Sequence, residues 1–223
     1  MTTEPDLGGQ APQKPRFRGV SHEVAFFVAL GLGPLLVGFA PSGRARWLVG
    51  IYAVCLLGLF GVSALFHRVN WSPRARRRMR RMDHSMIFIF IAGTYTPVAG
   101  LTLRDGLASF VLPVVWVLAV TGVVLKLAWL DAPKPLSATM YIGVGWVAIL
   151  AMPSLWSVLG PLGFTLLLAG GVCYTLGAIC YARRKPDPVP LVFGYHEVFH
   201  ALVIGAAICH LLVIAFFAMP QAH

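Results

Sequence analysis

Apolar stretches recur along almost the whole chain and are separated by short polar breaks. A helix of about 20 apolar residues spans the ~30 Å hydrocarbon core of a bilayer. Hydrophobic residues make up 58% of the 223 residues, charged residues only 12%, and the mean hydropathy is +0.77. Such a chain is too apolar for an ordinary water-soluble domain. The sequence therefore predicts an all-α integral membrane protein.

Hydropathy predicts a bundle of seven transmembrane helices over residues 21–218. The expected spans are 22–40, 47–67, 84–103, 109–130, 138–157, 160–181 and 194–218. Residues 1–20 are expected to form a disordered cytoplasmic tail, and residues 219–223 a short C-terminal tail. Basic residues precede the first apolar run, as in a signal peptide, but this run is longer than a usual signal core and no convincing cleavage site follows. We therefore interpret it as the first span.

Basic residues predict the orientation, because Lys and Arg beside the spans stay on the cytoplasmic side during insertion. With the N-terminus inside, 15 of the 18 Lys and Arg residues fall in cytoplasmic segments: Lys14, Arg16, Arg18, Arg68, Arg74, Arg76, Arg77, Arg78, Arg80, Arg81, Lys126, Lys134, Arg183, Arg184 and Lys185. Only Arg44, Arg46 and Arg104 fall outside. We expect a plasma-membrane protein with a cytoplasmic N-terminus and an external C-terminus.

Six of these basic residues lie in an arginine-rich loop predicted at residues 74–81. Its first role is to set the topology, and its second is to contact anionic headgroups, at ~1 kcal/mol per charge near the surface. Membrane lipids are therefore the expected partners, and nucleic acid is not; the sequence leaves the oligomeric state open. The four cysteines lie inside apolar runs without CxxC spacing, so we expect neither disulfides nor a thiolate metal site: Cys55, Cys173, Cys180 and Cys209.

Ionisable residues inside a membrane span are costly and need a partner or a function. His67 ends the second predicted span on the cytoplasmic side, and Asp83 opens the third there. His196 and His200 lie in the first two turns of the seventh. Four residues that are far apart in sequence are thus expected at one depth.

The spacing of the histidines points to a metal. His196 and His200 are four residues apart, so they share one helix face and can bind one ion. With His67 they would form a three-histidine site, for which Zn²⁺ is the expected ion, because nitrogen ligands favour borderline metals over Mg²⁺ or Ca²⁺. Asp83 could hold or deprotonate a water at such a site. Ser63 lies one turn before His67.

Other ionisable residues near this depth are assigned different roles. His84 adjoins Asp83 but points about 100° away, and His210 lies roughly 15 Å deeper than His200, so neither is expected to be a ligand. Glu197 is expected to pair with the arginine-rich loop. Glu23 could reach the site, although its place at a helix start explains it equally well. Small residues are expected to allow close helix packing: Gly93-Thr94, Gly143, Gly145 and Gly170-Gly171.

Four segments resemble the bacterial haemolysin III branch of the progestin and adipoQ receptor family. They are SALFHR (63–68), RMDHSMIFIFIAGTYTP (81–97), GGVCYTLGAICYARR (170–184) and HEVFHALVIGAAICH (196–210). The resemblance covers about residues 22–218. It implies a seven-helix bundle with a zinc ion near the cytoplasmic face, held by His67, His196 and His200. It also implies that Asp83 contacts the water on the metal and that Ser63 lies close by.

The first span departs from the family pattern. Members often carry E-x-x-N-x-x-x-H there, but in this chain Glu23 is followed by Phe26 and Leu30 at the positions of the Asn and His. Participation of the first span in the site is therefore in doubt.

Two classes of function fit these features. The first is a zinc-dependent hydrolase of lipid amides or esters, with Asp83 as general base and Ser63 as a binding or orienting group. In the second the zinc is structural or regulatory, in a protein that regulates membrane lipids or acts as a receptor, channel or cytolytic factor. A pore needs polar residues along the full membrane thickness, whereas here they concentrate at one end, so pore formation ranks lower.

Overall fold

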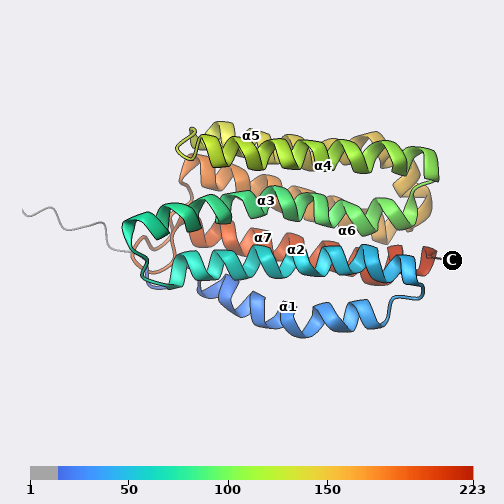
Figure 1. Ribbon diagram of the computed structural model, residues 1–223, viewed down its shortest axis with the longest axis horizontal. Coiled ribbons are helices and arrows are strands. Elements are labelled where there is room, and N and C mark those ends of the chain that lie inside the picture. The colour runs from blue at the N-terminus through green and yellow to red at the C-terminus, as the bar shows by residue number, and fades with distance from the viewer. Residues whose placement is uncertain (1–14, 223) are drawn as a thin grey trace, which may run out of the picture.

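The structure is a computed structural model that describes residues 15–222, and its regular elements are helices apart from one isolated bridge between Val189 and Phe193. The helices lie side by side along the long axis of the molecule (Figure 1). The α-helices are α1 (Val20–Gly38), α2 (Gly43–Arg68), α3 (Pro73–Thr102), α4 (Asp105–Ala128), α5 (Lys134–Gly145), α6 (Met152–Arg183) and α7 (Tyr195–Val213). A 3₁₀ segment, η1 (Trp146–Ala151), joins α5 to α6, and α7 continues through a π segment, η2 (Ile214–Ala218), and a 3₁₀ turn, η3 (Met219–Gln221).

Six helical segments are long and apolar enough to cross a membrane. The predicted fifth and sixth spans both fall within one of them, Lys134–Arg183, which has 50 residues. A straight helix of that length would measure about 75 Å at 1.5 Å per residue, more than twice a hydrocarbon core. Gly160 breaks this segment with φ 65° and ψ 178°, a backbone conformation that glycine adopts without strain. Figure 1 shows that the chain reverses direction within this segment.

The arginine-rich stretch at residues 74–81 is helical, so its prediction as a loop was wrong. Ser72 caps α3 by accepting a hydrogen bond from the backbone N–H of Ala75 at 3.4 Å, and Pro73 occupies the first turn, where its missing N–H costs nothing. Hydropathy does not detect this extension because its side chains are cationic. The apolar part of α3 begins only after it.

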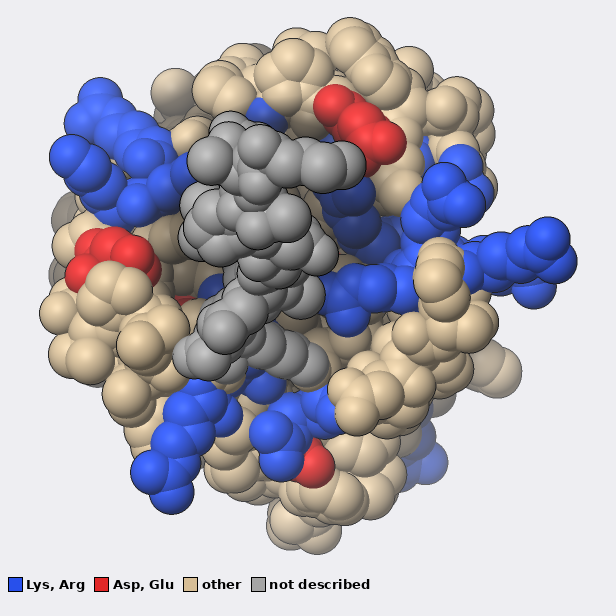
Figure 2. Space-filling model, turned by 90° about the vertical axis from the view of Figure 1, so that its left-hand side faces the viewer, with Lys and Arg blue, Asp and Glu red and all other residues tan. Residues whose placement is uncertain are grey.

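Basic side chains gather at one end of the bundle (Figure 2). This end holds the C-terminal ends of α2, α4 and α6 and the N-terminal ends of α3, α5 and α7. The predicted cytoplasmic Lys and Arg residues lie at these helix ends or directly beside them, except that Arg16 and Arg18 lie just before α1 and Lys14 lies outside the described residues. Arg44, Arg46 and Arg104 lie at the start of α2 and just before α4, at the other end.

The predicted disordered tail falls only partly within the described residues. Residues 15–19 form a turn that leads directly into α1, and their backbone N–H groups bond to another loop: Arg16 N–H to Leu191 O at 3.0 Å and Phe17 N–H to Val192 O at 3.2 Å. These five residues are ordered because another part of the chain satisfies their backbone. At the other terminus, residues 219–221 of the predicted tail extend the last helix as η3.

Two of the glycines predicted at close helix contacts occupy such contacts. A Cβ on Gly93 would lie 2.6 Å from Cys55 Sγ, and one on Gly170 would lie 2.4 Å from His210 Nε2. The prediction was wrong for Gly143, Gly145 and Gly171, where an added Cβ would meet nothing within 4 Å. Sequence identifies small residues, but the rotation of each helix decides which of them face a neighbour.

Candidate metal centre

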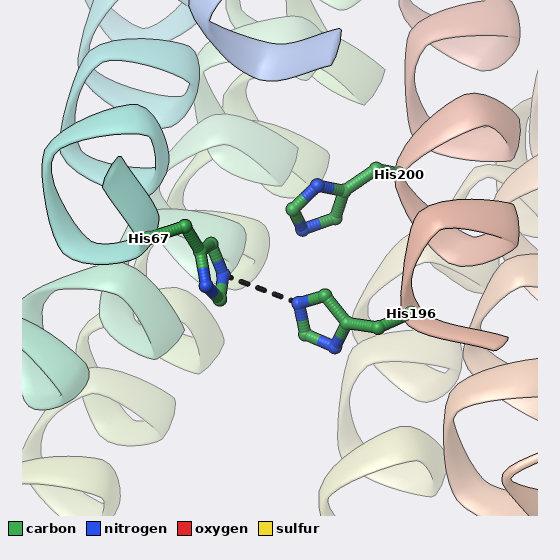
Figure 3. Close-up of side chains that lie close together, drawn as sticks. All are labelled: His67, His196 and His200. Atoms are coloured by element: carbon green, nitrogen blue, oxygen red, sulfur yellow. Dashed lines mark hydrogen bonds between the residues drawn. The ribbon is translucent and has the colours of Figure 1, made fainter. Parts of the chain in front are cut away.

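Three imidazoles from two helices meet at the basic end of the bundle (Figure 3). His67 comes from the last turn of α2, whereas His196 and His200 come from successive turns at the start of α7. The Nε2 atoms of His67 and His196 are 3.1 Å apart, and ligand atoms of all three residues lie within 4.8 Å of one another. All three side chains are buried. The structure therefore brings together the three residues that the sequence pattern singled out.

The donor set fits a borderline metal such as zinc. Zinc–nitrogen bonds of 2.0–2.1 Å in a tetrahedral site place two ligand nitrogens about 3.3 Å apart. The 3.1 Å separation of His67 from His196 is close to that value. A ring nitrogen of His200 also faces these two imidazoles (Figure 3). These three residues could thus hold one ion with little rearrangement.

Asp83 and Ser63 lie next to this cluster. Asp83 follows the arginine-rich stretch of α3, and its side chain interacts with the Ser63 hydroxyl. Both residues line the same cavity as His200. The arrangement places a carboxylate, a hydroxyl and an imidazole together at one end of this cavity, as the predicted roles require. Their catalytic roles remain predictions.

The cavity extends from this polar end into the middle of the bundle. Its volume is about 160 Å³, and most of its wall is apolar. The wall includes Phe90, Val98, Leu155, Phe164 and Val203, and His210 lies farther along it. A space of this kind suits an apolar ligand with one polar end.

His22 is a site residue that sequence reasoning missed. It lies in the first turn of α1, its side chain is 2% exposed, and its Nδ1 lies 2.8 Å from Ser63 Oγ. The family pattern of the first span points to positions 26 and 30, which are Phe26 and Leu30 in this chain. The sequence feature that could have identified it is its depth in the membrane. His22 lies at the start of the first predicted span, on the same side as the other site residues.

The acidic residues near the site have partners other than those expected. Glu23 forms an exposed ion pair with Arg68 at 2.8 Å. Glu197 was predicted to pair with the arginine-rich stretch, and this was wrong: its Oε1 accepts from Arg18 Nε at 2.5 Å and its Oε2 from the Gly194 N–H at 2.9 Å. Glu197 is 1% exposed, so this is a buried ion pair. It attaches the segment of residues 15–19 to the start of α7.

The two other histidines considered as ligands lie elsewhere. His210 Nε2 donates to the Leu167 carbonyl at 3.1 Å, deep in the bundle between α6 and α7. The His84 ring packs edge-on against Tyr181. Neither belongs to the three-histidine group.

Comparison with known proteins identifies relatives across nearly the full chain. A family model described as haemolysin-III related matches residues 10–211. Hemolysin-3 of Bacillus cereus is 32% identical over 91% of this chain and 94% of that protein, and the Hemolysin-3 homolog of Bacillus subtilis (strain 168) is 30% identical over 90% and 96%. The human monocyte to macrophage differentiation factor is 27% identical over 92% and 88%.

The family match includes every residue of the site described above, from His22 on α1 to His200 on α7. It agrees with the six helical segments that are apolar enough to span a bilayer. The chain is therefore a multi-pass membrane protein and belongs to the haemolysin III-related family.

Proposed function

We propose that this protein is a zinc-dependent hydrolase that cleaves the amide or ester bond of a membrane lipid. The observation that carries the proposal is the three-histidine cluster, one member of which, His200, lines the same cavity as Asp83 and Ser63. Zinc bound by three imidazoles supplies a Lewis acid and makes water nucleophilic at neutral pH.

The protein's own residues supply the remaining parts. Asp83 is a carboxylate at the cavity wall, where it accepts a proton during hydrolysis and returns it to the leaving group. Ser63 donates a hydrogen bond that orients this carboxylate. The apolar wall beyond them accommodates the acyl chain, so that the scissile bond lies beside the polar end.

Metal analysis combined with a hydrolysis screen tests this proposal. The detergent-purified wild type should contain zinc, whereas His196→Ala and His200→Ala should lose it; His210→Ala is the matched control and should keep it. Asp83→Ala should keep zinc and lose turnover of lipid amides or esters. Wild-type protein that binds no zinc under these conditions rejects the proposal.

The second candidate is a lipid-regulated, receptor-like protein in which zinc is structural. The buried Arg18–Glu197 pair favours it, because it fixes residues 15–19 beside the histidines and limits access from the basic end. Bound zinc without turnover of any lipid amide or ester would support this candidate. A channel or cytolytic role remains less favoured, and equal ion leak from liposomes with and without the protein would argue against it.

We also propose seven membrane crossings, with the N-terminus in the cytoplasm and the C-terminus outside. The support is the break at Gly160, which divides the 50-residue segment, and the gathering of basic residues at one end (Figure 2). An alkaline phosphatase fused to the C-terminus should be active, since the enzyme folds only outside the cytoplasm. A fluorescent cytoplasmic reporter at the same place would instead indicate an even number of crossings.

A further inference from the structure

His22 links the candidate metal ligands to the candidate catalytic pair. Its ring stacks on His200 with a centroid distance of 3.7 Å and an interplanar angle of 8°, and Phe60 packs edge-on against it at 5.1 Å. The same ring places Nδ1 2.8 Å from Ser63 Oγ. One side chain of α1 thus contacts both α2 and α7, the two helices that provide the three histidines.

The stacking excludes His22 as a fourth ligand of the same ion. An imidazole nitrogen directs its lone pair within the plane of the ring. Two nearly parallel, stacked rings cannot both direct such lone pairs at one ion. His22 can instead determine the plane in which His200 presents its nitrogen, since a buried ring packed between His200 and Phe60 has little freedom to turn.

The hydrogen-bond network also assigns the proton on His22. The proposed general-base role requires an ionised Asp83, and an ionised carboxylate can only accept, so the Ser63 hydroxyl donates its single proton to Asp83. Ser63 Oγ must then accept from His22, so Nδ1 carries the proton. Nε2 has no hydrogen-bond partner among residues 15–222, although the His200 carbonyl group lies beside the ring.

We propose that His22 is a positioning residue for both halves of the site. Its ring face holds His200 in the orientation that binds the metal, and its Nδ1–H holds the Ser63 hydroxyl so that the hydroxyl proton points to Asp83. The inference rests on the proposed zinc hydrolase and deepens it. It assigns to α1 a role that the missing Asn and His of the first-span pattern had put in doubt.

Two substitutions separate the two contacts. His22→Phe keeps a flat ring against His200 but loses the donor, and His22→Asn keeps an N–H donor near Nδ1 but loses the stack. His22→Ala removes both. Zinc affinity, measured by competition with a chelator, should stay within about threefold of wild type in His22→Phe and fall about tenfold in His22→Asn and His22→Ala, the range for residues that support metal ligands.

The cobalt-substituted proteins give a second readout. The visible spectrum of bound Co²⁺ reports ligand geometry, so it should be unchanged in His22→Phe and altered in His22→Asn. Turnover at saturating zinc should show the opposite order: it falls in His22→Phe as it does in Ser63→Ala, and it is largely kept in His22→Asn.

Three outcomes would overturn the inference. Wild-type zinc affinity in all three variants would show that the stack does not orient His200. Complete loss of zinc in His22→Phe, in protein that remains monodisperse, would show that a His22 nitrogen is itself a ligand. Turnover in His22→Phe equal to wild type would refute the link through Ser63. Absence of zinc from the wild type would instead reject the proposed function.

Discussion

Alanine at Gly19 is expected to disturb the metal centre from outside its ligand set. Gly19 has φ 82°, a left-handed conformation that costs a residue with a Cβ about 1–2 kcal/mol. A Cβ there would lie 2.5 Å from the Cβ of His67, which is attached to the α2 backbone and cannot swing aside. Such overpacking typically costs about 1–3 kcal/mol. The combined destabilisation is therefore about 2–5 kcal/mol unless His67 shifts.

Thermal unfolding in detergent and zinc competition together measure this effect. Gly19→Ala should lower both the unfolding temperature and the zinc affinity. Gly31→Ala is the matched control, because Gly31 lies in the same region of the chain, inside α1, and an added Cβ there meets nothing within 4 Å. If Gly19→Ala and Gly31→Ala behave alike in both assays, the close approach of residues 15–19 to His67 is wrong.

Three further predictions follow from the same structure. Zinc occupancy should fall as pH drops through the imidazole range near about 6.5, because three neutral imidazoles are needed to bind the ion and protons compete for them; zinc retained unchanged at pH 4 in a metal-buffered dialysis would contradict this. Arg18→Met should destabilise the protein by about 3–5 kcal/mol, because it leaves the buried Glu197 carboxylate without its cation; in the same unfolding assay, adding Glu197→Gln should recover part of the loss. Gly170→Ala should lower the unfolding temperature, at a cost of about 1–3 kcal/mol, because its Cβ would meet His210; the adjacent Gly171→Ala has open space and should not, so equal effects would refute this packing.

Sequence alone determined the features that depend on neighbouring residues along the chain. Hydropathy is a sum over about 20 consecutive residues, so it located the apolar helices. His196 and His200 share a face because four residues make about one helical turn, so their pairing needed no tertiary information. His67 was added to this pair because it lies at the cytoplasmic end of the second predicted span, which is the depth at which the seventh span begins. The three expected ligands lie together in the structure, in a group that could hold a metal ion.

The tertiary structure decided which helix faces meet. His22 stacks on His200 only because α1 packs against both α2 and α7 with a particular rotation, and no local pattern contains that rotation. The pairing of Glu197 with Arg18, rather than with the arginine-rich stretch, likewise depends on the path of residues 15–19 across the start of α7. Spacing along the sequence determines which residues share one face of a helix. The contacts of a site built from several helices depend on how those helices pack against one another.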